Sequence, residues 1–244
     1  MPQQQEWFST WFDSPYYHLL YSNRDAGEAQ LFLDNLLDHL HPKPDATILD
    51  LACGKGRHAI HLNQRGYDVT GIDLSPQSIA IAKQAENEKL HFAVHDMREV
   101  FRSGYFDFVL NLFTSFGYFA SETENVVALK AIAASVKPGG KLVIDFLNAE
   151  KVVANLVKEE TKTVEGVTFY ITRHMEGKLI VKNIKFEAEG KHHHFQEKVW
   201  ALTAEDFKEY FRMTDLRLHE CFGSYHFDPY DPATSDRLIF ILKK

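Results

Sequence analysis

The stretch TILDLACGKGRH, residues 47–58, decides how this chain is organised. Its first half is a short apolar run with a β-branched start, which predicts a buried strand over 47–53. Gly54 and Gly56 follow, and a helix is expected over 57–65. Glycines at alternate positions allow a tight turn and a close approach of the backbone to a ligand, since a Cβ there would collide with it. Because open α/β sheets bind ligands beyond the carboxyl ends of their strands, we expect a binding site here.

Buried strands alternate with helices along the chain up to about residue 150. Further strands are expected at 67–73, 90–96, 106–113 and 141–147, and further helices at 75–85 and 122–136. Ser75 and Pro76 mark one helix start, and Ser121 with Glu124 forms a capping box at another. The strands are too far apart for hairpins, so they predict a parallel sheet with helices on both faces.

The two ends of the chain carry different patterns. Apolar residues at three- and four-residue spacing predict two helical segments within 6–41, with a break near SNRDAG (22–27). Beyond residue 160, three successive alternating runs predict antiparallel strands, and Thr203 is expected to cap a helix. The final runs, within 216–225 and 237–244, are expected to form an antiparallel hairpin.

These patterns together predict an α/β fold, a Rossmann-like, doubly wound sheet of seven strands that ends in the antiparallel hairpin. We expect one domain over residues 1–244. Its parts are an N-terminal helical cap (1–45), a ligand-binding core (46–150), a β-rich insertion after strand five (160–202), and a closing helix and hairpin (203–244).

Composition restricts the class of protein and of partner. Apolar residues make up 45% and charged residues 25% of the 244 residues, which is typical of a globular protein. The formal net charge of −7 argues against a dedicated nucleic-acid binder. Cys53 and Cys221 are the only cysteines, and we find neither a signal peptide nor a membrane span in the sequence. These features predict a cytoplasmic protein. A local basic patch of Lys182, Lys185, Lys191 and Lys198 leaves RNA open as an alternative partner.

Acidic residues stand at the ends of successive predicted strands. Asp73 follows Gly56 by 17 residues, a spacing that suits a carboxylate accepting hydrogen bonds from ribose hydroxyls. Asp96 ends the third strand, where it could accept from an adenine amino group while the Met97 backbone meets the ring edge. We therefore expect an adenosine-containing ligand.

A dinucleotide site is the rival interpretation. Gly54, Gly56 and Ala59 satisfy the GxGxxA pattern, which would indicate an NAD(P)-dependent oxidoreductase. Three features oppose it: Asp50 lies within the strand end, a second acid ends strand three, and the chain closes with a hairpin where dinucleotide folds continue with parallel strands.

Residues 46–147 resemble the class I S-adenosylmethionine-dependent methyltransferases. The segments DLACGKGRHAIHL, GIDLS, VHDMRE, FDFVLNLFTSFGYF and LKAIAASVKPGGKLVID are similar to successive motifs of that family. The family pattern acid-x-Gly-x-Gly-x-Gly has Ala52 here in place of its first glycine. The segment YYHLLYSNRDAGEA is similar to the cap of small-molecule methyltransferases. The resemblance implies S-adenosylmethionine as cofactor and a small-molecule N or O acceptor.

The resemblance also implies roles for individual residues. Asp50, Ala52, Gly54 and Gly56 would surround the methionine portion, and Asp73 and Leu74 would hold the ribose. Asp96, Met97 and Arg98 would frame the adenine, while Asn111, Leu112 and Phe113 would lie beside the sulfonium. Tyr17 and Arg24, in the cap, would close over the cofactor carboxylate.

The acceptor would lie in a pocket lined by Phe116, Tyr118 and Phe119, just past the fourth strand. No catalytic residue is assigned, because a sulfonium leaving group is already activated and positioning supplies much of the catalysis. If the acceptor requires a general base, the candidates are His95, His226, Tyr118 and the run His192–His194. Strand alternation separates the histidines of that run, so no metal site is expected.

Motifs that are absent narrow the acceptor further. The fourth strand ends in NLFT without [DNS]PP[YFW], and no Pro-Cys occurs, so amide or adenine-amine methylation by that motif and C5-pyrimidine methylation are not expected. A small molecule remains the expected partner, in a monomer or homodimer. A non-catalytic domain that keeps the fold and the cofactor stays an alternative.

Overall fold

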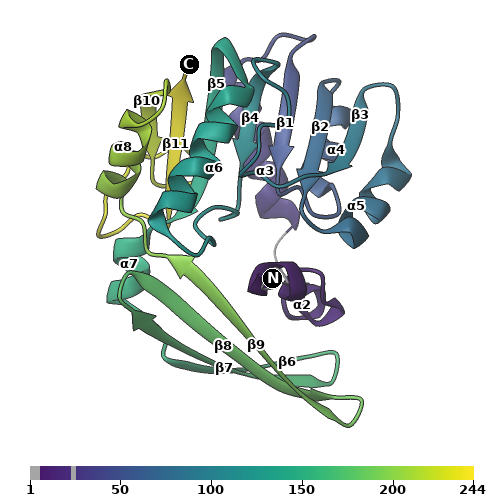
Figure 1. The fold of residues 1–244 in the computed structure, drawn as a ribbon, viewed down its shortest axis with the longest axis vertical. Coiled ribbons are helices and arrows are strands. Elements are labelled where there is room, and N and C mark those ends of the chain that lie inside the picture. Colours follow the sequence, from purple (N-terminus) through teal and green to yellow (C-terminus); the bar gives the residue numbers. More distant parts are fainter. Residues whose placement is uncertain (1–5, 23–25) are drawn as a thin grey trace, which may run out of the picture.

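The computed structural model describes residues 6–22 and 26–244. Its main sheet has seven strands in the order β10-β11-β5-β4-β1-β2-β3, as Figure 1 shows. The strands are β1 (Thr47–Leu51), β2 (Asp68–Asp73), β3 (Leu90–Val94), β4 (Phe106–Asn111), β5 (Val136–Leu147), β10 (Arg217–Phe222) and β11 (Arg237–Lys243). The first five are parallel, and β11 pairs antiparallel with both β5 and β10. The predicted doubly wound sheet with its closing hairpin is confirmed. The strand order reverses between β1 and β4, since β2 and β3 follow on one side of β1 and β4 and β5 on the other, and such sheets bind ligands at this switch point.

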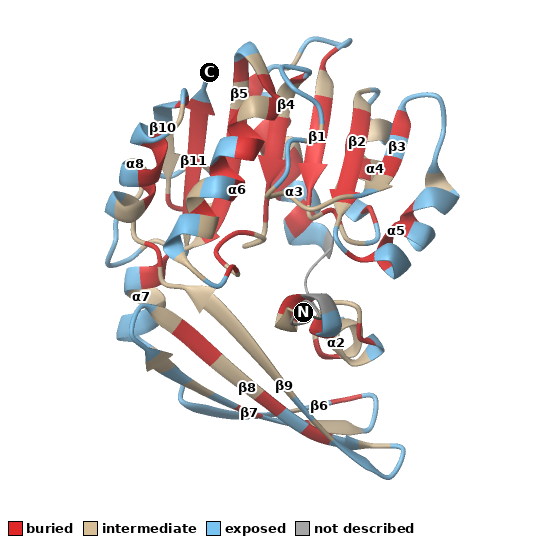
Figure 2. Ribbon diagram, in the orientation of Figure 1, coloured by how far each residue is buried: buried red, intermediate tan, exposed pale blue. Residues whose placement is uncertain are grey.

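Helices cover both faces of this sheet. These are α3 (Ala26–Leu40), α4 (Arg57–Gln64), α5 (Pro76–Ala82), α6 (Glu122–Ser135) and α8 (Ala204–Arg212), with a short 3-10 turn at Lys83–Ala85. Successive side chains of each strand point to opposite faces of the sheet. In β5, Leu142 and Ile144 pack with α6 and α8 on one face, whereas Val143 packs with α3 and α4 on the other. The central strands are therefore buried from both sides, as Figure 2 shows.

The insertion after β5 forms a second sheet of four antiparallel strands, in the order β6-β7-β8-β9. The strands are β6 (Glu159–Val164), β7 (Val167–Glu176), β8 (Leu179–Ala188) and β9 (Lys191–Trp200), and α7 (Ala149–Ala154) leads into them. The prediction of three strands is wrong by one. Glu165 (φ 46°) and Gly166 (φ 83°) make a two-residue turn that divides the first alternating run into a hairpin.

The N-terminal segment has three helices, α1 (Trp7–Trp11), α2 (Pro15–Leu20) and α3, where two were predicted. Ser14 accepts a hydrogen bond from the Tyr16 backbone N–H and Pro15 takes the first helical position, so the chain turns between α1 and α2. Trp11 is fully buried and its ring lies 4.5 Å from that of Phe195 in β9. Within the cap, α1 and α2 thus lie between the carboxyl end of the main sheet and the insertion sheet, while α3 packs on the main sheet (Figure 1).

Candidate functional site

A cavity of about 620 Å³ lies where the main sheet, the cap and the insertion sheet meet. Its size falls in the usual range of small-molecule sites. Twelve of the residues expected to bind the cofactor or the acceptor line it: Tyr17, Asp50, Ala52, Gly54, Asp73, Leu74, Asp96, Met97, Leu112, Phe113, Tyr118 and Phe119. The parallel sheet brings them together because the loops after its strands all open at one edge.

The loop after β1 is tied to the end of β2 by one carboxylate. Asp73 Oδ2 accepts the Gly54 backbone N–H at 2.8 Å, and Asp73 Oδ1 accepts the Ser75 backbone N–H at 2.8 Å. Burial raises the pKa of Asp73 above its ordinary value, and these hydrogen bonds oppose that rise. A carboxylate has about four acceptor positions, so Asp73 keeps capacity for donors in the cavity.

The backbone of this loop is left-handed at Ala52 (φ 55°), Gly54 (φ 55°) and Gly56 (φ 82°). A Cβ built on Gly54 meets nothing within 4 Å, so its backbone conformation is what favours glycine there. A Cβ on Gly56 would lie 2.6 Å from Phe92 Cζ, and Gly56 does not line the cavity. Gly56 therefore serves packing rather than the direct ligand contact expected from the sequence.

Asp50 is the most deeply buried carboxylate of the cavity wall, with 1% of the residue exposed. Its Oδ2 has no hydrogen-bond partner within the described part of the chain. Burial raises the pKa of Asp50 to about 7. A buried acceptor without a partner is costly, so this atom fits a donor supplied by a bound molecule.

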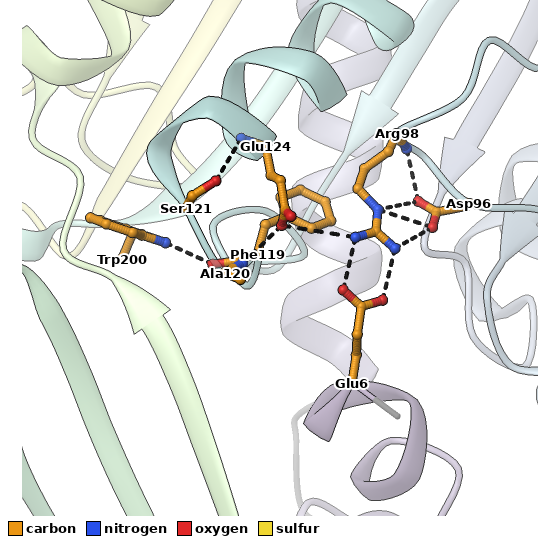
Figure 3. A network of polar contacts seen from close by, with 8 residues as sticks. All are labelled: Glu6, Asp96, Arg98, Phe119, Ala120, Ser121, Glu124 and Trp200. Carbon is orange, nitrogen blue, oxygen red and sulfur yellow. Dashed lines mark hydrogen bonds and ion pairs between the residues drawn. The ribbon is translucent and has the colours of Figure 1, made fainter. Parts of the chain in front are cut away.

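Arg98 holds the cap against the end of β3 instead of facing the cavity (Figure 3). Its guanidinium donates to Asp96 at 2.6 Å and to Glu6 at 2.7 Å, and it lies 5.2 Å from the centre of the Phe119 ring. Burial alone would raise the pKa of Asp96, but the hydrogen bonds from Arg98 lower it below its ordinary value. Asp96 is therefore ionised on the cavity wall. Arg98 does not line the cavity and affects it only by its contacts with Asp96.

The turn after β4 is strained. Phe113 (φ 56°) and Thr114 (φ 60°) are both left-handed although neither is glycine. Asp145, fully buried at the end of β5, accepts the Phe113 N–H at 2.8 Å through Oδ2 and the Thr114 N–H at 3.1 Å through its carbonyl. Arg237 donates to Asp145 Oδ1 at 2.8 Å and to Thr114 Oγ1 at 3.0 Å. These contacts hold the strained turn at the cavity wall.

The insertion sheet supplies a row of charged side chains at the far end of the cavity. Arg173, Lys182 and Glu197 line the cavity from β7, β8 and β9, and each lies directly opposite the next in strand register. Glu197 Oε1 accepts from Trp11 Nε1 at 2.7 Å and from the Tyr21 hydroxyl at 2.6 Å. The row is thus joined to the cap.

Several predicted residues lie elsewhere. Phe116 is fully buried in the core, 5.8 Å from the Phe207 ring, and Asn111 is fully buried below the strained turn without lining the cavity. Arg24 lies outside the described residues. Of the candidate bases, His95 and Tyr118 line the cavity, whereas His226 and the run His192–His194 do not. Within the described residues, no group of three or more His, Cys, Asp or Glu could hold a metal ion.

The lysines at 182, 185, 191 and 198 do not share one surface. Lys182 faces the cavity with 13% of its side chain exposed, while Lys185 follows on the opposite face of β8 and is exposed. The basic patch expected from the sequence is therefore divided between two faces of the insertion sheet.

Known proteins share both the sequence of the core and the fold of the chain. Residues 48–140 match the profile of a family described as a methyltransferase domain. The chain is 29% identical over 185 residues to dTDP-3-amino-3,6-dideoxy-alpha-D-glucopyranose N,N-dimethyltransferase of Streptomyces fradiae. The aligned region covers 72% of this chain and 72% of that enzyme. This chain belongs to the class I S-adenosylmethionine-dependent methyltransferases.

Solved structures agree with this assignment in fold. A methyltransferase of Clostridium acetobutylicum matches with a TM-score of 0.79 at 20% identity, over 93% of this methyltransferase and 95% of that chain. CalS10 of Micromonospora echinaspora is an amino pentose methyltransferase whose structure has S-adenosylmethionine bound. It matches with a TM-score of 0.68 at 21% identity, over 94% of this chain and 96% of that chain. Both likenesses show that the whole chain has the fold of these methyltransferases.

Sequence reasoning missed the residues that enter the methyltransferase's cavity from distant segments. These are Phe8, Phe12 and His18 from the cap, Glu28, Leu147, Val152, Leu156, the insertion residues Arg173, Ile180, Glu197 and Val199, and Tyr225 and Arg237 near the C-terminus. Alternation within β7 to β9 could have assigned Arg173 and Glu197 to one face. Nothing in the sequence indicates that this face meets the main sheet.

In the described part of the chain, no helix is long and apolar enough to cross a bilayer.

Proposed function

We propose that this methyltransferase transfers the methyl group of S-adenosylmethionine to the nitrogen of a small-molecule amine. One observation carries the proposal: the cavity at the carboxyl ends of β1 to β4 continues under the cap to the insertion sheet. Such a chamber has room for a cofactor and a second small molecule.

The acidic end of the cavity fits the cofactor. The Asp50 oxygen that lacks a partner would accept from the ammonium group of the methionine portion. Asp73 would accept from the ribose hydroxyls, and Asp96 from the adenine amino group with Met97 at the ring edge. Leu112 and the strained Phe113 would lie beside the sulfonium. The cofactor supplies, when bound, a methyl group that is already activated for displacement.

The chain contributes position and exclusion of water rather than a strong base. A neutral amine attacks with its own lone pair, in line with the leaving group, and the methylated nitrogen then loses a proton to solvent. Tyr118 donates its hydroxyl hydrogen to the Thr114 carbonyl at 2.5 Å, so its oxygen can accept an N–H of the acceptor and aim the lone pair. Phe12 and Phe119 add apolar walls.

Nitrogen is the proposed acceptor atom because two of the similar proteins are named as methyltransferases of amino sugars. These are the Streptomyces fradiae enzyme, an N,N-dimethyltransferase, and CalS10. The site also has a wall hydroxyl to orient an amine and needs no deprotonated catalytic group. We further propose that residues 1–244 form one domain, whose parts are the cap, the core, the insertion, and the closing helix and hairpin.

Calorimetry with S-adenosylhomocysteine, S-adenosylmethionine, NAD and NADP tests the cofactor site first. We expect micromolar binding of the two sulfur compounds and none of the nicotinamide nucleotides. Transfer of a labelled methyl group to a panel of small amines, each matched with the alcohol of the same skeleton, then tests the acceptor atom. Methylation of the alcohols but not the amines would contradict the proposal, as would binding of only NAD or NADP.

A further inference from the structure

The charges on the cavity wall are divided between its two ends. Asp50, Asp73 and Asp96 lie at the end formed by the main sheet. Arg173 and Lys182 lie at the end formed by the insertion sheet, and Glu197 is the carboxylate beside them. Glu28 and Arg57 also line the cavity and add one charge of each sign, and Arg237 adds a cation that is paired with Asp145. The main-sheet end therefore favours a cation, and the insertion end brings two cations to the cavity wall.

The two cations of the insertion sheet are direct neighbours. Arg173 of β7 and Lys182 of β8 are cross-strand partners on the face that looks into the cavity. Like charges directly opposite each other in a sheet repel, so this arrangement is unfavourable on its own. Both side chains are largely buried, with 20% and 13% exposed, so solvent screens the repulsion only partly.

The carboxylates near this pair lie on its outer sides. Arg173 donates to Glu160 of β6 at 2.6 Å, and Lys182 lies 3.6 Å from Glu197. Glu197 also accepts from Trp11 and Tyr21, so its charge is shared among three donors. Because neither carboxylate lies between the two cations, an anion in the cavity could contact both.

We propose that the acceptor is an amine that also carries a carboxylate or phosphate group, and that Arg173 and Lys182 bind this group. The inference rests on the proposed function and names the substrate class of the same site. The planar guanidinium of Arg173 can hold two oxygens of such a group, and Lys182 adds a point charge. The amine then points away from the insertion sheet, toward Tyr118 and the acidic end.

The test uses the full chain saturated with S-adenosylhomocysteine, titrated by calorimetry with inorganic phosphate and, separately, with succinate. We expect at least one anion to bind, and the stronger of the two identifies the group. Charged hydrogen bonds of this kind imply that Arg173→Gln and Lys182→Gln each weaken binding by about tenfold or more. Arg173→Lys, which keeps the charge, should restore most of it. Lys185→Gln, on the opposite face of β8, is the matched control and should bind as the wild type does.

A second measurement uses substrates. Among amines of one skeleton, those with a carboxylate or phosphate should have the lower KM, and Arg173→Gln should raise that KM about tenfold with little change in kcat and in the KM of neutral amines. Absence of anion binding, or equal binding by all variants, would overturn the inference while S-adenosylhomocysteine still binds. Loss of S-adenosylhomocysteine binding by the wild type would instead contradict the proposed function.

Discussion

The two ends of the cavity are built in different ways. The acidic end comes from loops that follow consecutive parallel strands, and Asp50, Asp73 and Asp96 lie within one stretch of the chain. The other end is assembled from the cap and the insertion, so that Phe12, Arg173 and Glu197 line the cavity from distant parts of the sequence. A parallel sheet places its loops at one edge automatically, whereas the second end depends on how separate elements pack.

The polar groups of the two ends also differ in whether they have partners within the protein. Asp50 at the acidic end has an oxygen without a partner in the described part of the chain. At the other end, Arg173 is held by Glu160, and Lys182 lies 3.6 Å from Glu197. The first end thus has an acceptor that only a bound molecule completes, while the cations of the second end also have partners within the protein. Substitutions should therefore affect ligand binding at the first end and stability or selectivity at the second.

The largest effect is expected from removing Arg237, because the fully buried Asp145 would lose its ionic partner. Arg237→Met should lower the free energy of unfolding by about 3 kcal/mol, the range for breaking a buried pair. The strained turn at Phe113 and Thr114 would lose a support as well. Urea denaturation measures the change. Arg217→Met, at an exposed position of β10, is the control and should shift stability by less than about 0.5 kcal/mol. Equal losses in both variants would mean that the pair of Arg237 with Asp145 does not stabilise the fold.

Asp73→Ala should abolish most cofactor binding, since its carboxylate ties Gly54 to Ser75 and would accept the ribose hydroxyls. We expect the Kd for S-adenosylhomocysteine to rise by about 100-fold or more, as for loss of charge-assisted hydrogen bonds. Calorimetry gives the value. Asp68→Ala, at the other end of β2, should bind normally. A small effect at position 73 would mean that the acidic end is not the cofactor site.

Cofactor binding should depend on pH through Asp50. Its pKa of about 7 in the protein alone means that the carboxylate is partly protonated near neutral pH. An ammonium group binds the ionised form, so the Kd should rise by about tenfold for each pH unit below 7. Titrations in buffers of different ionisation enthalpy should detect the released proton. Asp50→Asn should bind weakly with no such pH dependence, and a flat profile in the wild type would contradict the assignment.

The same group should affect stability with a defined sign. Burial raises the pKa of Asp50 from its ordinary value of 3.8 to about 7 in the folded state, so the folded protein holds a proton that the unfolded chain releases. Its contribution to stability is complete below about pH 4 and is lost as the pH rises through 7. Urea unfolding at several pH values should show that Asp50→Asn removes this decline.

The smallest effect is expected at Ala52, which has a left-handed backbone where the family has glycine. Ala52→Gly relieves backbone strain but gives the unfolded chain more freedom, so stability should rise by only about 0.5 kcal/mol. Gly54→Ala, at the same φ of 55°, should lose about 1 kcal/mol. Changes in stability of opposite sign for the two substitutions would confirm that the left-handed backbone of this loop favours glycine at both positions.

The sequence predicted the main fold well and the insertion less well. Strand–helix alternation and the capping residues Ser75 and Ser121 indicated the parallel sheet, because these signals are local. The turn at Glu165 and Gly166 was missed although the same Glu-Gly pair occurs at 176–177 and 189–190, where the later turns of the insertion lie. Phe116 was assigned to the acceptor pocket although it packs in the core, since sequence does not show which side of a loop faces inward.

The sequence by itself determined the acidic end of the site. The spacing of Asp50, Gly54, Asp73 and Asp96 places them at adjacent strand ends in any parallel sheet of this order. Tertiary structure alone decided the other end and the ion pairs that support the cavity wall. The pairing of Arg237 with Asp145, of Arg98 with Glu6, and the row of Arg173, Lys182 and Glu197 join segments far apart in the chain. Such contacts depend on the packing of whole elements, and no local pattern encodes them.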